Sequence, residues 1–168
     1  MRLKYKNLDL GCGIKKLENY IGIDIGDFDY PKGEFIKGDV FEVLEQIDKG
    51  TIEQIYSNQF IEHIPKDKFI GFMNSCYRVL KEDGFFECIF PPAIRQDGMP
   101  NGEYYADPTH VNAMLPGTFA CFSRKYRDKV YKELGTDYRG YGIETDLDIT
   151  KVSFINPSQV QVELVKRI

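Results

Sequence analysis

Short apolar runs separated by glycine-rich or polar turns predict a series of β-strands. They cover residues 6–10, 20–24, 34–37, 52–57 and 85–90. The run at 85–90 is apolar at nearly every position, which is typical of a central strand in a parallel sheet. Near the carboxyl end, residues 150–155 and 159–166 flank Asn156-Pro157-Ser158, and the second run alternates apolar with polar residues. These two runs predict a half-exposed antiparallel hairpin.

Helical spacing appears in two longer segments and one short one. After Pro65, apolar residues recur at intervals of three and four on one face, which predicts a core helix: Phe69, Phe72, Met73, Cys76, Tyr77 and Leu80. Pro116 begins a helix that we expect to run to about Leu134, with Gly135 as its carboxyl cap. A short helix is expected at 41–47. Strands that alternate with helices predict an α/β fold: a Rossmann-like, doubly wound sheet of about seven strands, mostly parallel and closed by the antiparallel hairpin.

Length and composition predict one cytoplasmic domain. The 168 residues suffice for a single domain, 1–168, with its own core. The net charge of -4 gives no general attraction to nucleic acid. Neither an apolar leader segment nor an apolar run near 18 residues occurs, so no membrane span is expected. The four cysteines are scattered, which argues against a zinc site or disulfides.

The turn after the first strand carries the strongest chemical signal. Gly11 and Gly13 leave backbone that a ligand can approach closely. A dinucleotide fingerprint would need a third glycine where Lys16 stands, and no Gly-Lys-Ser/Thr phosphate loop occurs. Only residues 14–19 separate Gly13 from Tyr20, so the first crossover helix is expected to shrink to a turn or less. Because a dinucleotide pyrophosphate needs a helix N-terminus, this shortening also argues against NAD or FAD.

The segment D-L-G-C-G followed by Y-I-G-I-D-I resembles the first two motifs of class I S-adenosylmethionine (SAM) dependent methyltransferases. The segment R-V-L-K-E-D-G-F-F resembles the "RVLKPGG" stretch of the same enzymes, with Glu82-Asp83 in place of Pro-Gly. The resemblance covers roughly the first 120 residues and is nearest to the small type 11-like branch. It implies SAM as the methyl donor and S-adenosylhomocysteine as the product.

The resemblance also implies a set of cofactor residues that follow the first four strands. They are Asp9, Gly11, Cys12 and Gly13 after the first strand, Asp24 and Ile25 after the second, Asp39 and Val40 after the third, and Asn58 and Gln59 after the fourth. Asp24 would accept the ribose hydroxyls, and Asp39 would face the adenine amino group. Asp39 is equally suited to cap the following helix, and the two roles are compatible.

Residues 91–115 form the least regular stretch, and we expect an insertion over 91–127 to act as a substrate lid. Asp107-Pro108-Thr109-His110 resembles an element of small methyltransferases, in which Asp107 and His110 could form a general base. An Asx turn is the alternative. His63 is the less favoured base, and positioning is its favoured role. Tyr104, Tyr105 and Arg124 are the candidate acceptor-binding residues, and two histidines alone predict no metal site.

These features predict methyl transfer from SAM to a small molecule with an oxygen or nitrogen nucleophile, such as a modest metabolite or a sugar-like or phosphorylated acceptor. We expect no second domain that could recognise a polymer. The alternative is a non-catalytic SAM-binding module or a subunit that needs a partner, and a homo-oligomer could complete the pocket of either. An NAD-dependent enzyme on the same sheet is the least favoured hypothesis.

Overall fold

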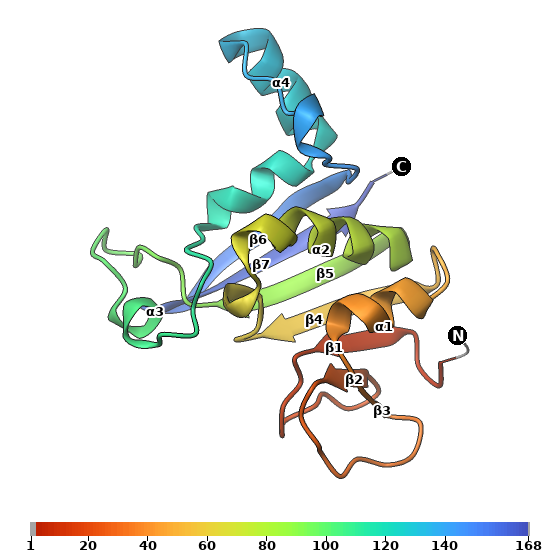
Figure 1. Cartoon of the computed structure of the whole chain (residues 1–168). Coiled ribbons are helices and arrows are strands. Elements are labelled where there is room, and N and C mark those ends of the chain that lie inside the picture. Colours follow the sequence, from red (N-terminus) through yellow and green to blue (C-terminus); the bar gives the residue numbers. More distant parts are fainter. Residues whose placement is uncertain (1–2, 168) are drawn as a thin grey trace.

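The computed structural model describes residues 3–167 and builds them around one seven-stranded sheet, with strand order β3-β2-β1-β4-β5-β7-β6 (Figure 1). The strands are β1 (Asn7–Leu10), β2 (Ile21–Asp24), β3 (Phe35–Lys37), β4 (Ile52–Asn58), β5 (Leu80–Phe90), β6 (Leu147–Asn156) and β7 (Gln159–Lys166). The helices are α1 (Val40–Gln46), α2 (Lys66–Val79), α3 (Gly102–Ala106) and α4 (Arg124–Leu134), with 3-10 turns η1 (Ile61–His63), η2 (Pro116–Phe122) and η3 (Arg139–Tyr141).

The sheet confirms the predicted mixture of parallel and antiparallel strands. β1 to β5 pair in parallel, and β7 lies antiparallel between β5 and β6. Val160, Val162 and Leu164 of β7 are fully buried, and the residues between them are half-buried. The terminal hairpin therefore closes the sheet with the alternation that the sequence predicts.

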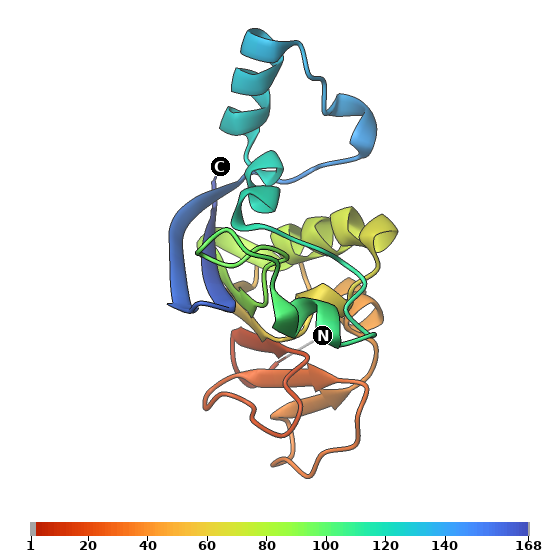
Figure 2. The same cartoon turned by 90° about the vertical axis from the view of Figure 1, so that its left-hand side faces the viewer.

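The strand order reverses between β1 and β4, so right-handed crossovers place the first two connections on one face and the next two on the other. The connections that lead to β4 and β5 carry α1 and α2, which lie side by side over one face (Figures 1 and 2). The connections from β1 to β2 and from β2 to β3, which are fully described, carry no helix. The sheet is doubly wound in topology but has helices over one face only.

Side chains replace the missing first crossover helix. The backbone N–H of Leu17 donates to Asp9 Oδ2 at 2.8 Å, and that of Gly13 donates to Asp24 Oδ2 at 2.9 Å. The Tyr30 hydroxyl donates to the Gly13 carbonyl at 2.9 Å and accepts from the Lys16 N–H at 3.0 Å. The predicted short crossover is thus confirmed, and it is fixed by carboxylates and a phenol rather than by helical hydrogen bonds.

Two predicted boundaries are wrong. The strand predicted at 85–90 begins earlier, at Leu80 beside Ile52, and a register shift between Ile52 and Gln54 accommodates the added residues of β5 as a bulge. The single helix expected from Pro116 breaks at Ser123, which ends η2 and caps α4. The Ser123 hydroxyl also donates to Asp148 at 2.6 Å, which ties the break to β6. Gly135 caps α4 in the left-handed conformation, as predicted.

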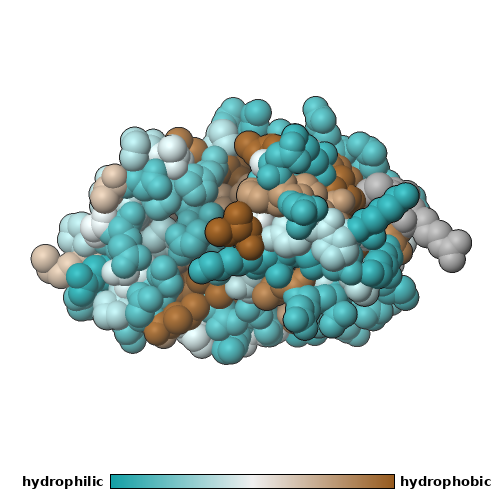
Figure 3. Space-filling model, turned by 90° about the horizontal axis from the view of Figure 1, so that it is seen from below, coloured by the Kyte–Doolittle hydropathy of each residue, from teal (hydrophilic) through white to brown (hydrophobic). Residues whose placement is uncertain are grey.

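An aromatic cluster on the helix-covered face joins α2 to β5 and η2. Its members are Phe69 and Phe72 of α2, Phe86 and Phe90 of β5, and Phe119 and Phe122 of η2. All are at most 5% exposed, so this cluster holds the α2 layer and the following segment onto the sheet. Toward the β2–β3 edge, apolar groups are scattered among hydrophilic ones (Figure 3). Within residues 3–167 no helix has the length and apolar character needed to cross a bilayer.

Candidate functional site

Two cavities lie at the carboxyl ends of the parallel strands, where open α/β sheets bind ligands. One, of about 450 Å³, is lined by Gly11, Asp24, Ile25, Asp39, Val40, Phe41, Gln59, Phe60, His63, Ile64 and Pro65. The other, of about 420 Å³, is lined by Asp9, Gly11, Cys12, Gly13, Ile14, Lys15, Leu17, Tyr56, Asn58 and Gln59. Gly11 and Gln59 line both cavities, which are therefore adjacent. The structure brings every predicted cofactor residue to this pair of cavities.

Gly11 and Gly13 both adopt left-handed backbone, with φ of 65° and 51°. A Cβ atom on Gly11 would lie 2.4 Å from the Phe60 ring, whereas one on Gly13 would have open space around it. Gly11 is therefore required for both backbone conformation and packing, and Gly13 for conformation alone. Gln59 also has a positive φ of 53°, which marks strained backbone at the opposite wall of the site.

Asp24 ends β2 with its carboxylate at the rim of the larger cavity. Oδ2 accepts the Gly13 N–H at 2.9 Å and Oδ1 accepts the Gly26 N–H at 2.8 Å. Each oxygen retains a further lone pair, so the carboxylate can still accept hydrogen bonds from a diol. Ile25 beside it is 77% exposed and offers an apolar surface at the cavity. The pair suits a sugar with an attached flat ring.

Two further acids frame the cavities. Asp39 accepts the Phe41 N–H at 2.8 Å and so caps α1. It also lines the larger cavity, so the predicted capping role and a role in the cavity are compatible. Asp9 is almost fully buried, and this burial raises the pKa of its carboxyl to about 6. One of its oxygens is used by Leu17, so Asp9 serves the turn as well as the cavity wall.

His63 and His110 meet at the carboxyl end of the sheet although they are far apart in sequence. Their rings lie 4.9 Å apart in an edge-to-face arrangement. The N–H groups of Val111 and Asn112 donate to the Glu62 carbonyl at 3.0 and 3.1 Å, which ties the segment after α3 to η1. Both predicted imidazoles are thus in one place, together with the neighbouring Glu62. We call Glu62, His63 and His110 the histidine cluster.

Glu62 is the least expected member of the histidine cluster. Its side chain is 0% exposed, and neither carboxylate oxygen has a hydrogen-bond partner among the residues that the structure describes. Burial raises the pKa of this carboxyl to about 7. Its Oε1 lies 3.9 Å from His110 Nε2, which is too far for a hydrogen bond. A buried carboxylate without a partner is costly and is typical of a functional position.

The predicted pair of Asp107 and His110 is loose. Asp107 Oδ2 lies 3.7 Å from His110 Nε2. Asp107 Oδ1 accepts the N–H and the hydroxyl of Thr109, which is the Asx-type turn considered as the alternative. These hydrogen bonds from Thr109 lower the pKa of the Asp107 carboxyl. Asp107 therefore lies near His110 and also forms the Asx-type turn. The turn fixes the position from which its carboxylate faces His110.

The three candidate acceptor residues lie in different environments. Tyr104 is 5% exposed and its ring stacks on that of His110 at 5.4 Å, so it supports the imidazole instead of lining an open pocket. Tyr105 is 61% exposed on the lid. Arg124 is not brought to this site, because α4 projects away from the sheet (Figure 1). Arg124 contacts Asp146 through both its backbone N–H and its guanidinium group.

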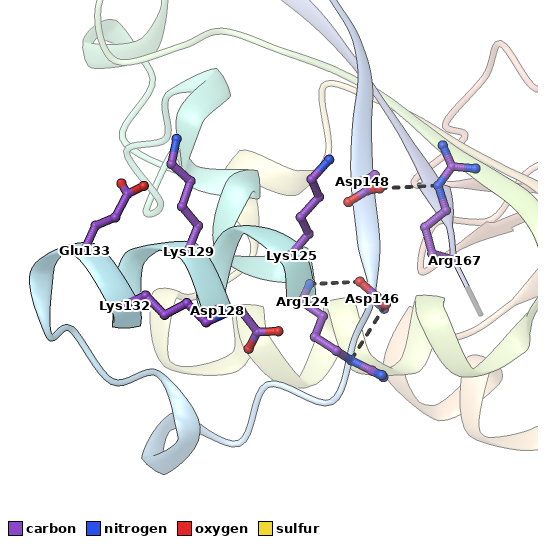
Figure 4. A pocket seen from close by; sticks show the side chains of 9 residues that line it. All are labelled: Arg124, Lys125, Asp128, Lys129, Lys132, Glu133, Asp146, Asp148 and Arg167. Carbon is purple, nitrogen blue, oxygen red and sulfur yellow. Dashed lines mark hydrogen bonds and ion pairs between the residues drawn. The ribbon is translucent and has the colours of Figure 1, made fainter.

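Arg124 belongs to a separate cavity of about 630 Å³, which we call the α4 charged groove (Figure 4). Its lining side chains carry both signs of charge: Arg124, Lys125, Asp128, Lys129, Lys132, Glu133, Asp146, Asp148 and Arg167. Arg167 pairs with Asp148 at 3.3 Å. This arrangement is typical of a solvated helix face and offers no uniform field for an anion.

Sequence reasoning missed two residues of the site. Phe60 packs against Gly11 and lines the larger cavity, but nothing in its sequence neighbourhood singles it out. Glu62 is not among the candidate residues that the sequence predicts. Two histidines alone predict no metal site, but Glu62 is adjacent to His63, and hydrogen bonds from residues 111 and 112 to the Glu62 carbonyl bring His110 to η1.

Comparison with protein-family models and with curated proteins finds no match. Solved structures are similar in fold at low sequence identity. A SAM-dependent methyltransferase from Archaeoglobus fulgidus superposes with a TM-score of 0.64 at 18% identity, over 95% of this chain and 85% of that one. A Haloferax volcanii complex with the Trm112 methyltransferase activator gives 0.64 at 12% identity, over 100% of this chain and 84% of the matched chain.

A third similar structure is Burkholderia thailandensis 1,6-didemethyltoxoflavin-N1-methyltransferase, which holds its substrate and S-adenosylhomocysteine. It superposes with a TM-score of 0.59 at 11% identity, over 96% of this chain and 71% of that one. The seven-stranded sheet, mostly parallel with an antiparallel hairpin at its end, agrees with this set. The chain therefore has the fold of class I SAM-dependent methyltransferases.

Proposed function

We propose that this protein binds SAM across the two adjacent cavities and transfers its methyl group to a small molecule. The observation that carries this proposal is the convergence of the residues after β1, β2, β3 and β4 on cavities that share Gly11 and Gln59. The resemblance in sequence predicts these same residues as SAM ligands. Their convergence supports the assignment beyond the likeness of fold.

The residues present suit the parts of SAM. Asp24 has lone pairs for ribose hydroxyls, and Ile25 offers an apolar surface for adenine. Asp39 and the Val40 backbone stand where a ring edge with an amino group would be recognised. The open space beside the left-handed backbone of Gly13 suits an amino-acid moiety. SAM carries no phosphate, so the absence of a helix after β1 does not count against it.

When bound, SAM supplies a methyl group on a sulfonium, which activates the carbon for displacement. The chain's own contribution is to hold the acceptor in line and to exclude water, and such positioning can supply roughly 7–11 kcal/mol. The lid segment and the histidine cluster adjoin the larger cavity through His63. They are therefore the groups that would orient an acceptor.

Calorimetric titration with SAM, S-adenosylhomocysteine and NAD tests this proposal. We expect micromolar binding of SAM and of the demethylated product, and no binding of NAD. Asp24→Ala should abolish binding, but it also removes two hydrogen bonds to the backbone. Ile25 is exposed and packs in no core, so Ile25→Glu should weaken binding without destabilising the fold. Ile155→Glu, at an exposed position of β6 away from the site, is the matched control. Failure of wild type to bind either ligand would refute the proposal.

A partner-dependent subunit is the second candidate function. The connections that would carry helices on one face of the sheet are short loops, and a Haloferax volcanii protein of similar fold is found with a methyltransferase activator. A second copy of this chain would serve the same purpose. Sedimentation of the purified protein with and without S-adenosylhomocysteine tests this: a monomer that binds the ligand with micromolar affinity needs no partner for binding.

A further inference from the structure

We propose that Glu62, His63 and His110 form a binding site for one divalent transition-metal ion, with Zn²⁺ as the preferred probe. Each residue offers one ligand atom, and these atoms lie within 4.8 Å of one another. Two imidazoles and one carboxylate are the donor set of many catalytic zinc sites and of other first-row metal sites. The site lies beside the larger cavity, because His63 also lines that cavity.

The imidazoles are already oriented for this role. His110 Nδ1 lies 2.9 Å from the Tyr104 carbonyl, and His63 Nδ1 lies 3.1 Å from the Thr109 carbonyl. A carbonyl oxygen can only accept, so both Nδ1 atoms carry the proton and both Nε2 atoms keep a lone pair. Backbone carbonyls that fix histidine tautomers in this way are the usual outer partners of metal-bound histidines.

The carboxylate supplies an independent indication. Glu62 is completely buried, and both of its oxygens lack a partner among residues 3–167. Its Oε1 faces His110 Nε2 at 3.9 Å, a separation that leaves room for an ion between two ligand atoms rather than a direct hydrogen bond. An ion at this point would satisfy the orphaned carboxylate and both imidazole lone pairs at once.

The backbone holds the three ligands together across a long sequence separation. The Val111 and Asn112 N–H groups both donate to the Glu62 carbonyl, and Tyr104 stacks on the His110 ring. Three protein ligands leave at least one coordination position for water or for an oxygen or nitrogen atom of a second molecule. Asp107 borders this site: Thr109 holds its Oδ1, and its Oδ2 lies 3.7 Å from His110 Nε2.

The test is titration of chelator-treated full-length protein with Zn²⁺ by calorimetry and with Co²⁺ by visible absorption, in the absence of SAM. We expect one ion per chain, and a cobalt spectrum without thiolate charge-transfer bands. Glu62→Gln, His63→Asn and His110→Asn should each weaken Zn²⁺ at least about a hundredfold, since loss of an outer partner alone costs 10–100-fold. Mg²⁺, which prefers oxygen ligands, should not compete.

Glu103→Gln on the exposed face of α3 is the matched control, and it should bind Zn²⁺ like wild type. A rise in the unfolding temperature on addition of Zn²⁺, present in wild type and absent in the three ligand variants, gives a second readout. The proposal is overturned if wild type binds no Zn²⁺, or if the ligand variants bind it as tightly as wild type. Neither result depends on SAM binding, so the two proposals fail separately.

Discussion

The histidine cluster and the α4 charged groove both contain several ionisable side chains. They differ in how deeply these side chains are buried and in whether each charge has a partner of opposite sign. The groove is the larger feature, about 630 Å³, and its side chains carry both signs of charge and include the ion pairs Arg124–Asp146 and Arg167–Asp148. The histidine cluster is small, Glu62 is fully buried, and its carboxylate has no partner among the described residues. By the criterion of an uncompensated buried charge, the histidine cluster is a better candidate for a functional site than the larger groove is.

The largest predicted effect on stability concerns the turn after β1, which lines both cavities. Gly11→Ala should lower the free energy of unfolding by about 2–4 kcal/mol, because it adds left-handed strain and a clash with Phe60. Gly13→Ala carries strain alone and should cost about 1 kcal/mol. Urea unfolding of both variants measures the difference. Equal losses would show that the Phe60 contact has no energetic consequence.

A double variant isolates the contact itself. Phe60→Ala should remove the clash, so Gly11→Ala combined with Phe60→Ala should lose less stability than the sum of the two single changes. Simple additivity would contradict the packing argument. The same variants report on ligand binding, because Gly11 and Phe60 both line the larger cavity.

Asp9 predicts a pH-dependent effect. Burial raises the pKa of its carboxyl from 3.8 to about 6, so the folded state binds the proton more tightly than the unfolded chain does. This group's contribution to stability therefore falls as the pH rises from about 4 to about 6. Asp9→Asn removes that dependence and should gain about 3 kcal/mol relative to wild type across this window, as an upper estimate.

Chemical denaturation at several pH values between 4 and 8 measures this effect. The exposed Asp128 of α4 provides the control: Asp128→Asn should change stability by less than about 0.5 kcal/mol at pH 7. A difference between Asp9→Asn and wild type that does not vary with pH would contradict the assignment.

The sheet and the cofactor cavities could be predicted from the sequence because local signals carry them. Apolar runs identify strands, Gly11 and Gly13 identify the turn after the first strand, and a parallel sheet brings successive strand ends together. The bulge in β5 and the break at Ser123 could not be predicted, since each depends on a partner distant in sequence: Ile52 for the bulge and Asp148 for the break.

The histidine cluster lies between these cases. Glu62 and His63 are adjacent in sequence, and His110 lies in a motif that was noticed, but their meeting depends on hydrogen bonds from Val111 and Asn112 to the Glu62 carbonyl. No local pattern encodes that contact. Arg124 is the opposite case. The sequence predicts it as an acceptor-binding residue, but α4 carries it away from the cavities (Figure 1).

The smallest predicted effects concern α4 itself. Arg127 donates to the carbonyls of Cys121 and Thr145, both at 2.8 Å, and Arg127→Ala should lower the free energy of unfolding by about 2 kcal/mol. Arg124→Ala removes an exposed ion pair with Asp146 and should cost less than about 1 kcal/mol. Thermal unfolding of the two variants measures both losses of stability. A larger loss for Arg124→Ala would mean that the α4 charged groove is more than a solvated surface.

The most direct test of the site's location is hydrogen–deuterium exchange of the whole chain with and without S-adenosylhomocysteine. We predict slower exchange in the segments after β1, β2, β3 and β4, which line the two cavities, and unchanged exchange in α4. Protection confined to α4 and the groove beside it, or protection nowhere, would contradict the account.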